Sequence, residues 1–128
     1  MTSYFEQFGG HKFFSKFVDD FYQGVSTDPI LRPMYPEEEL TGAKKRLLMF
    51  LEQYWGGPTT YSEKRGHPRL RMRHAPFPIG FKAKAAWLTH MQAALNNQDL
   101  SPELRDTLWN YLSTAAEAMV NMRDDDVI

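Results

Sequence analysis

Four long stretches of the sequence repeat apolar residues at three- and four-residue spacing, the period of an amphipathic helix. The first begins after Gly9-Gly10 and carries the stripe Phe13, Phe14, Phe17, Val18, Phe21, Tyr22 and Val25. The second follows an acidic run at 37–40, which favours the positive end of a helix dipole, and has the stripe Ala43, Leu47, Phe50, Leu51 and Tyr54. No strand pattern rises above this background, so we predict an all-α fold.

The other two long helices are predicted in the C-terminal half. One runs from about Phe81 to Asn96, with the stripe Phe81, Ala85, Leu88, Met91 and Leu95 and with Trp87 and Ala94 beside it. The last starts at Ser101-Pro102-Glu103, a good N-terminal signal, and turns inward Leu104, Leu108, Tyr111, Leu112, Ala115, Met119 and Val120.

Turn residues separate the predicted helices. Thr27-Asp28-Pro29 predicts a cap and a short helix from Pro29 to about Met34, which ends before Tyr35-Pro36. Gly56-Gly57-Pro58 ends the second long helix. From Thr59 to Gly80 no sustained period is present, and a loop of that length in a compact domain is usually functional or disordered.

The basic stretch from Gly66 to Phe77 lies inside that loop. Pro68 and Pro76 bracket about two helical turns, which places His74 near the C-terminal end of a short helix. A histidine held in this way can offer one ring nitrogen to a metal while a carbonyl orients the other. A lone histidine at a helix end is, however, more often a cap or a surface group, so this stretch alone leaves both interpretations open.

Composition narrows the class of protein. A chain of 128 residues fits one domain, and Lys+Arg 15 against Asp+Glu 16 counts against a dedicated nucleic-acid binder. The sequence has no cysteine, which excludes disulfides, thiolate nucleophiles and zinc sites of the cysteine type. No signal-peptide pattern and no run of 18 apolar residues is present, so we expect a cytoplasmic protein without a membrane span.

Five blocks of sequence resemble the group II truncated haemoglobins of actinobacterial type, in order and with the family's spacing over nearly the whole chain. They are Phe21-Tyr22, Met34 to Glu37, Met49 to Pro58, Gly66 to Phe77 and Trp87-Leu88. The resemblance implies a two-over-two helical sandwich that encloses haem b. It implies a single globin domain over residues 1–122, and we expect the acidic tail 123–128 to be frayed.

The resemblance also implies the site residues. His74 becomes the proximal ligand of the haem iron through Nε2, and Tyr22, Tyr35 and Trp87 become the distal hydrogen-bond donors. Ala43 occupies the position where many globins carry a distal histidine. The expected haem contacts are Phe21, Ala43, Arg46, Leu47, Phe50, Tyr61, His67, Leu70, Arg73, Phe77, Trp87 and Met91. Among them, Arg73 and Arg46 are candidates to pair with the propionates, and the place of His67 before Pro68 favours a structural role.

These residues lead to a functional expectation. Donors aimed at bound dioxygen in a dry pocket stabilise its negative charge and slow its release, which argues against simple oxygen transport. We expect binding of dioxygen, carbon monoxide, nitric oxide or peroxide. Nitric oxide dioxygenation or peroxidase-type turnover is the expected chemistry, with electrons from an external reductase.

Two further interpretations follow from the residues themselves. A haem-free helical module that binds anions or a partner through the arginine-rich loop is the alternative from another class, and a colourless purified protein would support it. The exposed parts of Tyr54 and Trp55 are candidate contacts for a homo-oligomer.

Overall fold

The computed structural model describes residues 2–124. Met1 and residues 125–128, which include most of the tail predicted to be frayed, lie outside the described residues. The described chain forms helices and no strand, as predicted: α1 (Tyr4–Phe8), α2 (Gly10–Val25), η1 (Arg32–Met34), α3 (Thr41–Tyr54), α4 (Thr60–Arg65), α5 (Leu70–His74), α6 (Phe81–Asn96) and α7 (Pro102–Met119).

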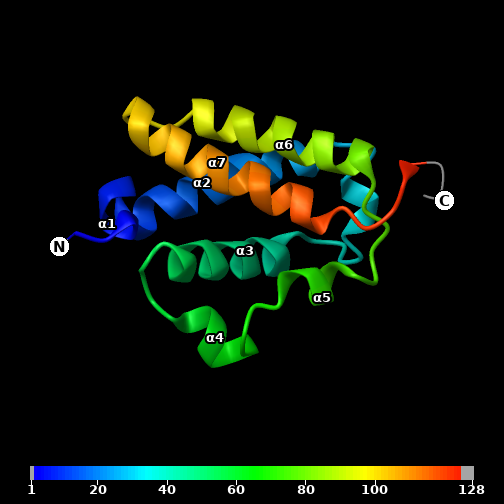
Figure 1. Ribbon diagram of the computed structural model, residues 1–128, viewed down its shortest axis with the longest axis horizontal. Helices are drawn as coiled ribbons and strands as arrows, with labels where there is room; N and C mark the ends of the chain where they lie inside the picture. The colour runs from blue at the N-terminus through cyan, green and yellow to red at the C-terminus, as the bar shows by residue number, and fades with distance from the viewer. Residues whose placement is uncertain (1, 125–128) are drawn as a thin grey trace.

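The helices form a two-over-two sandwich. Helix α2 packs against both α3 and α6, and α6 packs against α7. Figure 1 shows α6 and α7 lying together in the upper part of the molecule, with α3 below them and the short helices α4 and α5 below α3. Within residues 2–124, no helix is long and apolar enough to cross a membrane.

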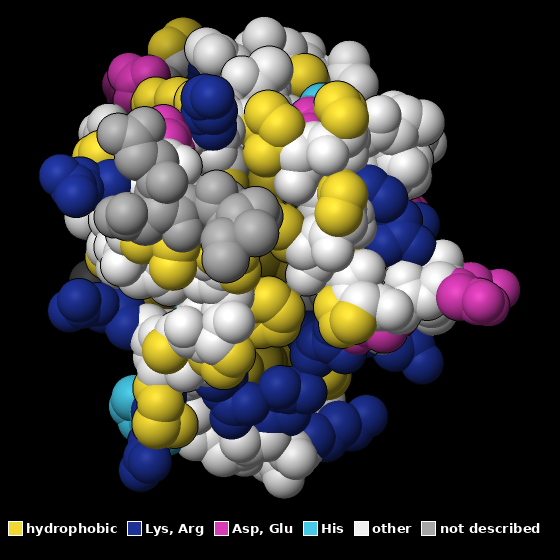
Figure 2. Space-filling model, turned by 90° about the vertical axis from the view of Figure 1, so that its right-hand side faces the viewer, with side chains coloured by type: hydrophobic (Ala, Val, Ile, Leu, Met, Phe, Trp, Pro, Cys, Tyr) yellow, Lys and Arg dark blue, Asp and Glu magenta, His cyan; other side chains and the backbone are white. Residues whose placement is uncertain are grey.

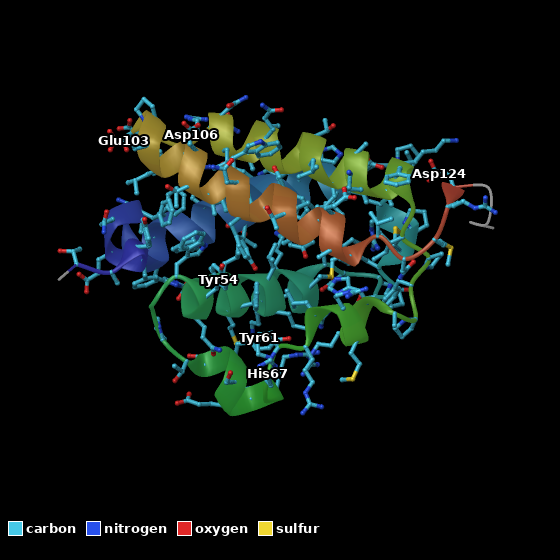
Figure 3. The ribbon with its side chains drawn as sticks, in the orientation of Figure 1. Tyr54, Tyr61, His67, Glu103, Asp106 and Asp124 are labelled. Carbon is cyan, nitrogen blue, oxygen red and sulfur yellow. The ribbon has the colours of Figure 1, made fainter. Side chains whose placement is uncertain are left out.

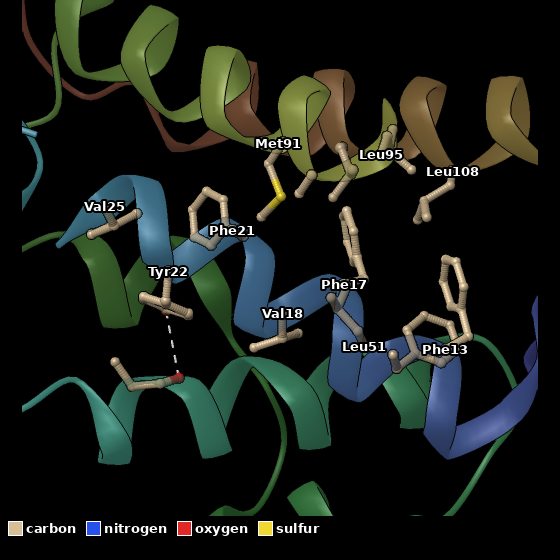
Figure 4. Packing of buried hydrophobic residues seen from close by; sticks show 14 of the residues in the cluster. Phe13, Phe17, Val18, Phe21, Tyr22, Val25, Leu51, Met91, Leu95 and Leu108 are labelled. Carbon is tan, nitrogen blue, oxygen red and sulfur yellow. Dashed lines mark hydrogen bonds between the residues drawn. The ribbon is translucent and has the colours of Figure 1, made fainter. Parts of the chain in front are cut away.

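Aromatic side chains of α2 form the centre of the core. The predicted stripe is confirmed, because all seven of its residues are buried, with Phe14, Phe17 and Phe21 fully so. Figure 4 shows the rings of Phe13, Phe17 and Phe21 together with Met91 and Leu95 from α6, Leu108 from α7 and Leu51 from α3. Burial of large apolar side chains is the main force that holds the two layers together.

Two local signals set the start of the chain. The Ser3 hydroxyl accepts from the backbone N–H of Glu6 and caps α1, which then ends at Gly9 with a φ of 123°. Such a positive φ is readily available only to glycine, so α1 and α2 meet at a sharp corner. The N–H of Phe5 donates to the Trp55 carbonyl at 2.8 Å, which joins α1 to the end of α3.

The buried face of α6 differs from the predicted stripe only at its start. Met91 and Leu95 of that stripe are buried, as is Ala94 beside it, and Trp87 is partly buried. Phe81, however, is 51% exposed and Ala85 is exposed, and Ala83 is buried in their place. The periodicity was compatible with two adjacent stripes. Because α6 packs against α2 on one side and α7 on another, tertiary contacts select the stripe that contains Ala83, Trp87 and Met91.

The end of α3 also differs from the prediction. Tyr54 is 51% exposed, while Trp55 is only 9% exposed because its ring packs edge-on against Tyr4 and Phe8. The expectation that Trp55 offers a surface for a partner is therefore wrong. Tyr54 alone keeps that exposure.

Two connecting segments differ from the prediction: one expected helix is only a short turn, and one helix was not expected. The helix predicted from Pro29 is only the 3-10 turn η1, because the Asp28 carboxylate accepts from the N–H groups of Ile30 and Leu31 and holds a turn there. Helix α4 was not predicted. It is six residues long, too short to show a period, and the Gln53 amide fixes it through two hydrogen bonds to Ser62.

Candidate functional site

A cavity of about 460 Å³ lies between the two layers. Side chains from α2, α3, α4, α5, α6 and α7 line it, together with the corner after η1. Figure 2 looks onto the end of the molecule near α5 and shows apolar side chains in a recess with Lys and Arg side chains around it. The volume is in the range of small-molecule and cofactor sites.

His74 contributes an imidazole to the cavity wall. It is the last residue of α5, as its bracketing prolines predicted, and its Nδ1 lies 2.7 Å from the Leu70 carbonyl. Because a carbonyl can only accept, Nδ1 carries the proton and Nε2 keeps its lone pair. The carbonyl partner expected of a metal-binding histidine is therefore present.

Arg73 braces the loop that leads into α5. Its Nε donates to the Pro68 carbonyl and its Nη2 to the Arg65 carbonyl, both at 2.7 Å. The guanidinium also lies 5.7 Å from the centre of the buried Tyr61 ring. These contacts fix the position of α5, and Nη1 is the guanidinium nitrogen left for a carboxylate.

Two tyrosines meet on another part of the wall. The rings of Tyr22 and Tyr35 are 5.7 Å apart and nearly perpendicular, and the Tyr22 hydroxyl donates to the Ala43 carbonyl at 3.5 Å (Figure 4). Burial, and then the neighbouring Tyr35, raise the pKa of Tyr22 far above its ordinary value. Burial also raises the pKa of Tyr35. Both phenols therefore stay protonated and able to donate at neutral pH.

The corner that carries Tyr35 is held by an arginine. Arg32 donates from Nη1 to the Tyr35 carbonyl at 3.0 Å and from Nη2 to the carbonyls of Glu37 and Glu38 at 2.8 and 2.6 Å. No sequence pattern indicated these bonds. They hold Tyr35 in an extended conformation at the point where the sequence predicted the short helix to end.

Trp87 reaches the cavity from α6. Its ring packs at 68° against Phe21, with 5.7 Å between the ring centres. In Figure 1, α2 and α6 lie above α3 whereas α5 lies below it. Tyr22 and Trp87 thus come to the cavity from helices on the opposite side of α3 from α5, which carries His74.

A charged pair stands at the rim. Arg46 donates to the Glu37 carboxylate at 2.7 Å, and this bond holds the pKa of Glu37 below its usual range. The second oxygen of Glu37, Oε2, is buried and has no hydrogen-bond partner within the described structure. Arg46 lines the cavity, so its guanidinium can serve Glu37 or an acidic group in the cavity.

Most of the predicted contacts line the cavity, and three do not. The wall includes Tyr22, Tyr35, Ala43, Arg46, Leu47, Phe50, Tyr61, Leu70, Arg73, His74, Phe77 and Trp87. Phe21 and Met91 are fully buried behind this wall in the core. His67 is exposed on the loop after α4 (Figure 3), and its Nδ1 accepts from the Arg69 N–H at 3.3 Å.

Several lining residues were not named as site residues from the sequence. The largest group comes from α7: Tyr111, Leu112, Ala115, Ala116 and Met119. Most of these residues were predicted to face inward, so the helical period of α7 was the sequence feature that could have identified them as cavity-lining. Arg65, Lys84 and Glu37 also line the cavity, and no short-range pattern marks them.

The set of donors suits one kind of occupant. A single imidazole with a free Nε2 can bind one metal ion from one side, apolar walls suit a flat hydrophobic ring, and Arg46, Arg65, Arg73 and Lys84 suit acidic substituents. The residues present therefore fit a metal-bearing macrocycle with carboxylate groups.

Comparisons with known proteins agree with this fit. The family described as bacterial-like globin matches residues 3–121. The group 2 truncated hemoglobin YjbI of Bacillus subtilis is 41% identical over 115 residues, which are 90% of this chain and 86% of that protein.

Solved structures give the same picture. A thermostable haemoglobin from the actinobacterium Thermobifida fusca superposes with a TM-score of 0.93 at 55% identity, covering 94% of this chain and 98% of that one. The group II truncated haemoglobin from Bacillus anthracis superposes with a TM-score of 0.93 at 37% identity, covering 98% and 96%.

Proposed function

Because the chain belongs to the bacterial-like globin family, and within it to the group II truncated haemoglobins, we propose that it is a haem b protein with His74 as proximal ligand and Tyr22, Tyr35 and Trp87 as distal donors. Globins bind haem and, through it, diatomic ligands such as oxygen. The haem iron supplies the ligand-binding position, and the chain's own residues decide how the ligand is held.

One observation carries the assignment of His74. Its Nδ1 is committed to the Leu70 carbonyl at 2.7 Å inside one turn of α5, so the ring can present only Nε2 to a metal. The hydrogen bond fixes the ring orientation and raises the basicity of Nε2. Arg73 holds the preceding loop, which keeps this geometry from shifting.

The distal side chains support strong retention of an oxygen ligand. Tyr22 and Tyr35 stay protonated, and the Tyr22 bond to Ala43 is long, so its hydroxyl can turn toward a ligand. At about 0.5 to 1.5 kcal/mol for each net hydrogen bond, two or three donors slow release by one to a few orders of magnitude. A protein with slow release suits turnover of the ligand better than its transport.

We further propose redox chemistry at this site, either oxidation of nitric oxide by dioxygen or reduction of peroxide, with a separate reductase as electron source. The protonated phenols are the groups that donate hydrogen bonds to a ligand oxygen and so stabilise the negative charge that develops on it. Stopped-flow mixing of the oxygenated protein with nitric oxide checks the first reaction. Formation of stoichiometric nitrate is expected, and release of unreacted nitric oxide would contradict it.

The haem-free alternative makes an opposite prediction. Arg73 is turned toward carbonyls and Tyr61, so the arginine-rich loop is not a uniformly free basic surface. A chain that purifies colourless and takes up no haem on reconstitution would favour that alternative.

The test of the proximal ligand is an absorption spectrum of the haem-reconstituted chain, oxidised, reduced, and reduced under carbon monoxide. The Soret band of the parent is expected to shift at each step. The Soret band of His74→Gly is expected to be weaker than that of the parent, and added imidazole is expected to restore it. His67→Gly is the matched control from the same loop, and its spectrum is expected to follow the parent. Parent-like spectra for His74→Gly would remove His74 as the ligand.

A further inference from the structure

A partly buried histidine–carboxylate pair joins α6 to the segment between α2 and η1. Nε2 of His90 on α6 lies 2.6 Å from Oδ2 of Asp28, and the two side chains are 23% and 13% exposed. Because a carboxylate can only accept, Nε2 carries the proton. On its other side the imidazole lies against α2, since a Cβ added at Gly24 would be 2.2 Å from Nδ1. The ring therefore stands where three segments of the chain meet.

These three segments are the ones that carry the proposed distal donors. Tyr22 comes two residues before Gly24 on α2, and Trp87 comes about one turn before the imidazole on α6. Tyr35 follows η1 at the end of the segment 28–35. The imidazole does not itself line the cavity, so it can act on a ligand there only through these neighbours.

Asp28 passes the restraint on to the corner that carries Tyr35. Its Oδ1 accepts from the N–H groups of Ile30 and Leu31 at 2.7 and 2.9 Å, and its carbonyl accepts from the N–H of Arg32 at 2.9 Å. Arg32 in turn donates to the Tyr35 carbonyl. Hydrogen bonds, first of all that from the imidazole, hold the pKa of Asp28 below its usual range. The carboxylate is therefore charged at neutral pH, which strengthens its bond to Nε2.

We propose that His90 is a positioning residue for the distal donors, which holds Trp87 and the Tyr35 corner at a fixed separation through its bond to Asp28. The inference rests on the proposed function, because it concerns how these donors meet a ligand of haem. A hydrogen bond weakens steeply as its distance and angle depart from the ideal. Loss of the link between α6 and the segment 28–35 should therefore weaken the bonds to a ligand oxygen even though every donor is still present.

A second histidine–carboxylate pair provides a comparison away from the donors. Nδ1 of His11 lies 2.6 Å from the carboxylate of Glu52 and joins α2 to α3, although this imidazole is more exposed. Neither residue lines the cavity. His11 is eleven residues before Tyr22, or about 16 Å along the axis of α2. The two pairs share their chemistry and join helices, but only the pair of His90 adjoins the donors.

The test measures dioxygen release from the haem-loaded protein and the infrared stretching band of bound carbon monoxide. His90→Leu keeps an apolar side chain of similar size without the donor. We expect it to release dioxygen about two- to tenfold faster, the effect of one net hydrogen bond. The carbon monoxide band should move to higher frequency, because a donor beside the ligand oxygen weakens the carbon–oxygen bond. His90→Gln, whose amide can still donate to Asp28, should restore both values, and His11→Leu, the matched control, should leave both unchanged.

Two further variants separate positioning from a general loss of packing. Asp28→Asn keeps Oδ1 for the two backbone N–H groups but removes the charged acceptor that faces the imidazole. It should speed dioxygen release as His90→Leu does, and it decides the question if His90→Leu does not fold. In a chain that already carries Trp87→Phe and Tyr35→Phe, His90→Leu should cause no further acceleration, because the donors that it positions are absent.

Urea unfolding of each variant adds a readout that involves no ligand. A less stable His90→Leu with parent-like dioxygen release and carbon monoxide band would show a merely structural pair and overturn the inference. Equal changes in His11→Leu, no recovery in His90→Gln, or a full effect of His90→Leu in the chain without the Trp87 and Tyr35 donors would also overturn it. These outcomes leave the proposed function standing, whereas a parent that binds no haem overturns the proposed function as well.

Discussion

Tyr22 is the side chain whose effect on a ligand can be isolated most cleanly. Its hydroxyl has a long bond to the Ala43 carbonyl and also interacts with the Tyr35 side chain, while its ring is held by Phe21 and Tyr35, so removing the oxygen leaves the packing of the ring in place. Tyr22→Phe is expected to speed dioxygen dissociation by about two- to tenfold, the value of one net hydrogen bond. Stopped-flow dissociation of dioxygen measures this directly.

Carbon monoxide provides an internal control for Tyr22→Phe. Bound carbon monoxide carries little negative charge, so its release should change much less than that of dioxygen. Tyr54→Phe, outside the cavity, should leave both rates near the parent's. Equal acceleration of both gases in Tyr22→Phe would show that the variant opened the pocket instead of removing a donor.

Arg32 positions Tyr35 through the backbone of the corner, not through the Tyr35 hydroxyl. Replacing Arg32 by Met removes the donor to three carbonyls of the corner at 35–38 while keeping a long apolar side chain. We expect a loss of about 1 to 2 kcal/mol in the free energy of unfolding and faster dioxygen release, because Tyr35 is no longer held in place. Urea unfolding and stopped-flow kinetics check the two effects. Arg71→Met, an exposed arginine on α5, is the control, and a similar loss there would contradict the argument.

At the scale of elements, α2 and α6 pack closely at Gly24. A Cβ added at Gly24 would lie 2.2 Å from Nδ1 of His90, whose Nε2 is 2.6 Å from the Asp28 carboxylate. The imidazole is therefore held over Gly24 and cannot move aside freely. Gly24→Ala is expected to cost about 1 to 3 kcal/mol of unfolding free energy by forcing the helices apart.

Two companion variants test that explanation by thermal or urea unfolding. Gly42→Ala meets only the flexible end of Arg46, at 3.1 Å, and gains helix propensity, so it should stay within about 1 kcal/mol of the parent. Adding His90→Ala to Gly24→Ala removes the clashing ring and should recover part of the loss. No recovery in the double variant would falsify the steric account.

At the scale of the whole molecule, three tyrosines link stability to alkaline pH, Tyr22 buried and Tyr35 and Tyr111 partly buried. Burial raises the pKa of Tyr22, Tyr35 and Tyr111 above the ordinary value of 10.0. Above about pH 10 the unfolded chain loses these protons while the folded chain keeps them. The unfolded state then binds fewer protons, so the free energy of unfolding is unaffected below about pH 10 and falls as pH rises beyond it.

Urea unfolding at neutral pH and above pH 10 measures that dependence. Tyr111→Phe removes one of the three groups and should lose less stability than the parent over the alkaline step. Tyr4→Phe, with an exposed ring, should keep the parent's slope. The comparison is between variants because lysines titrate in the same range.

Residues whose roles depend on near neighbours were predictable from the sequence. The stripe of α2 is spaced by the helical period, and Asp28 and Ser101 cap N–H groups two or three residues away. His74 and Leu70 are four residues apart in one short helix, so the bracketing prolines were enough to expect a carbonyl partner.

Residues whose roles depend on distant contacts were not predictable in this way. The buried face of α6, the burial of Trp55 beside an exposed Tyr54, and the contact of Tyr54 with Tyr111 each depend on elements far away in the chain. Two expected haem contacts, Phe21 and Met91, lie in the core behind the cavity wall for the same reason, whereas the third outside the wall, His67, is exposed on its loop.

The sequence by itself therefore determined the four long helices, the caps at Asp28 and Ser101, the family and the short helix that ends in His74, because hydrogen bonds and apolar periods within a few residues decide these features. Only the tertiary structure decided which stripe of α6 is buried, why Trp55 is buried beside an exposed Tyr54, and that Tyr111 packs against Tyr54. Those features come from packing between segments tens of residues apart, where many side chains compete for the same space.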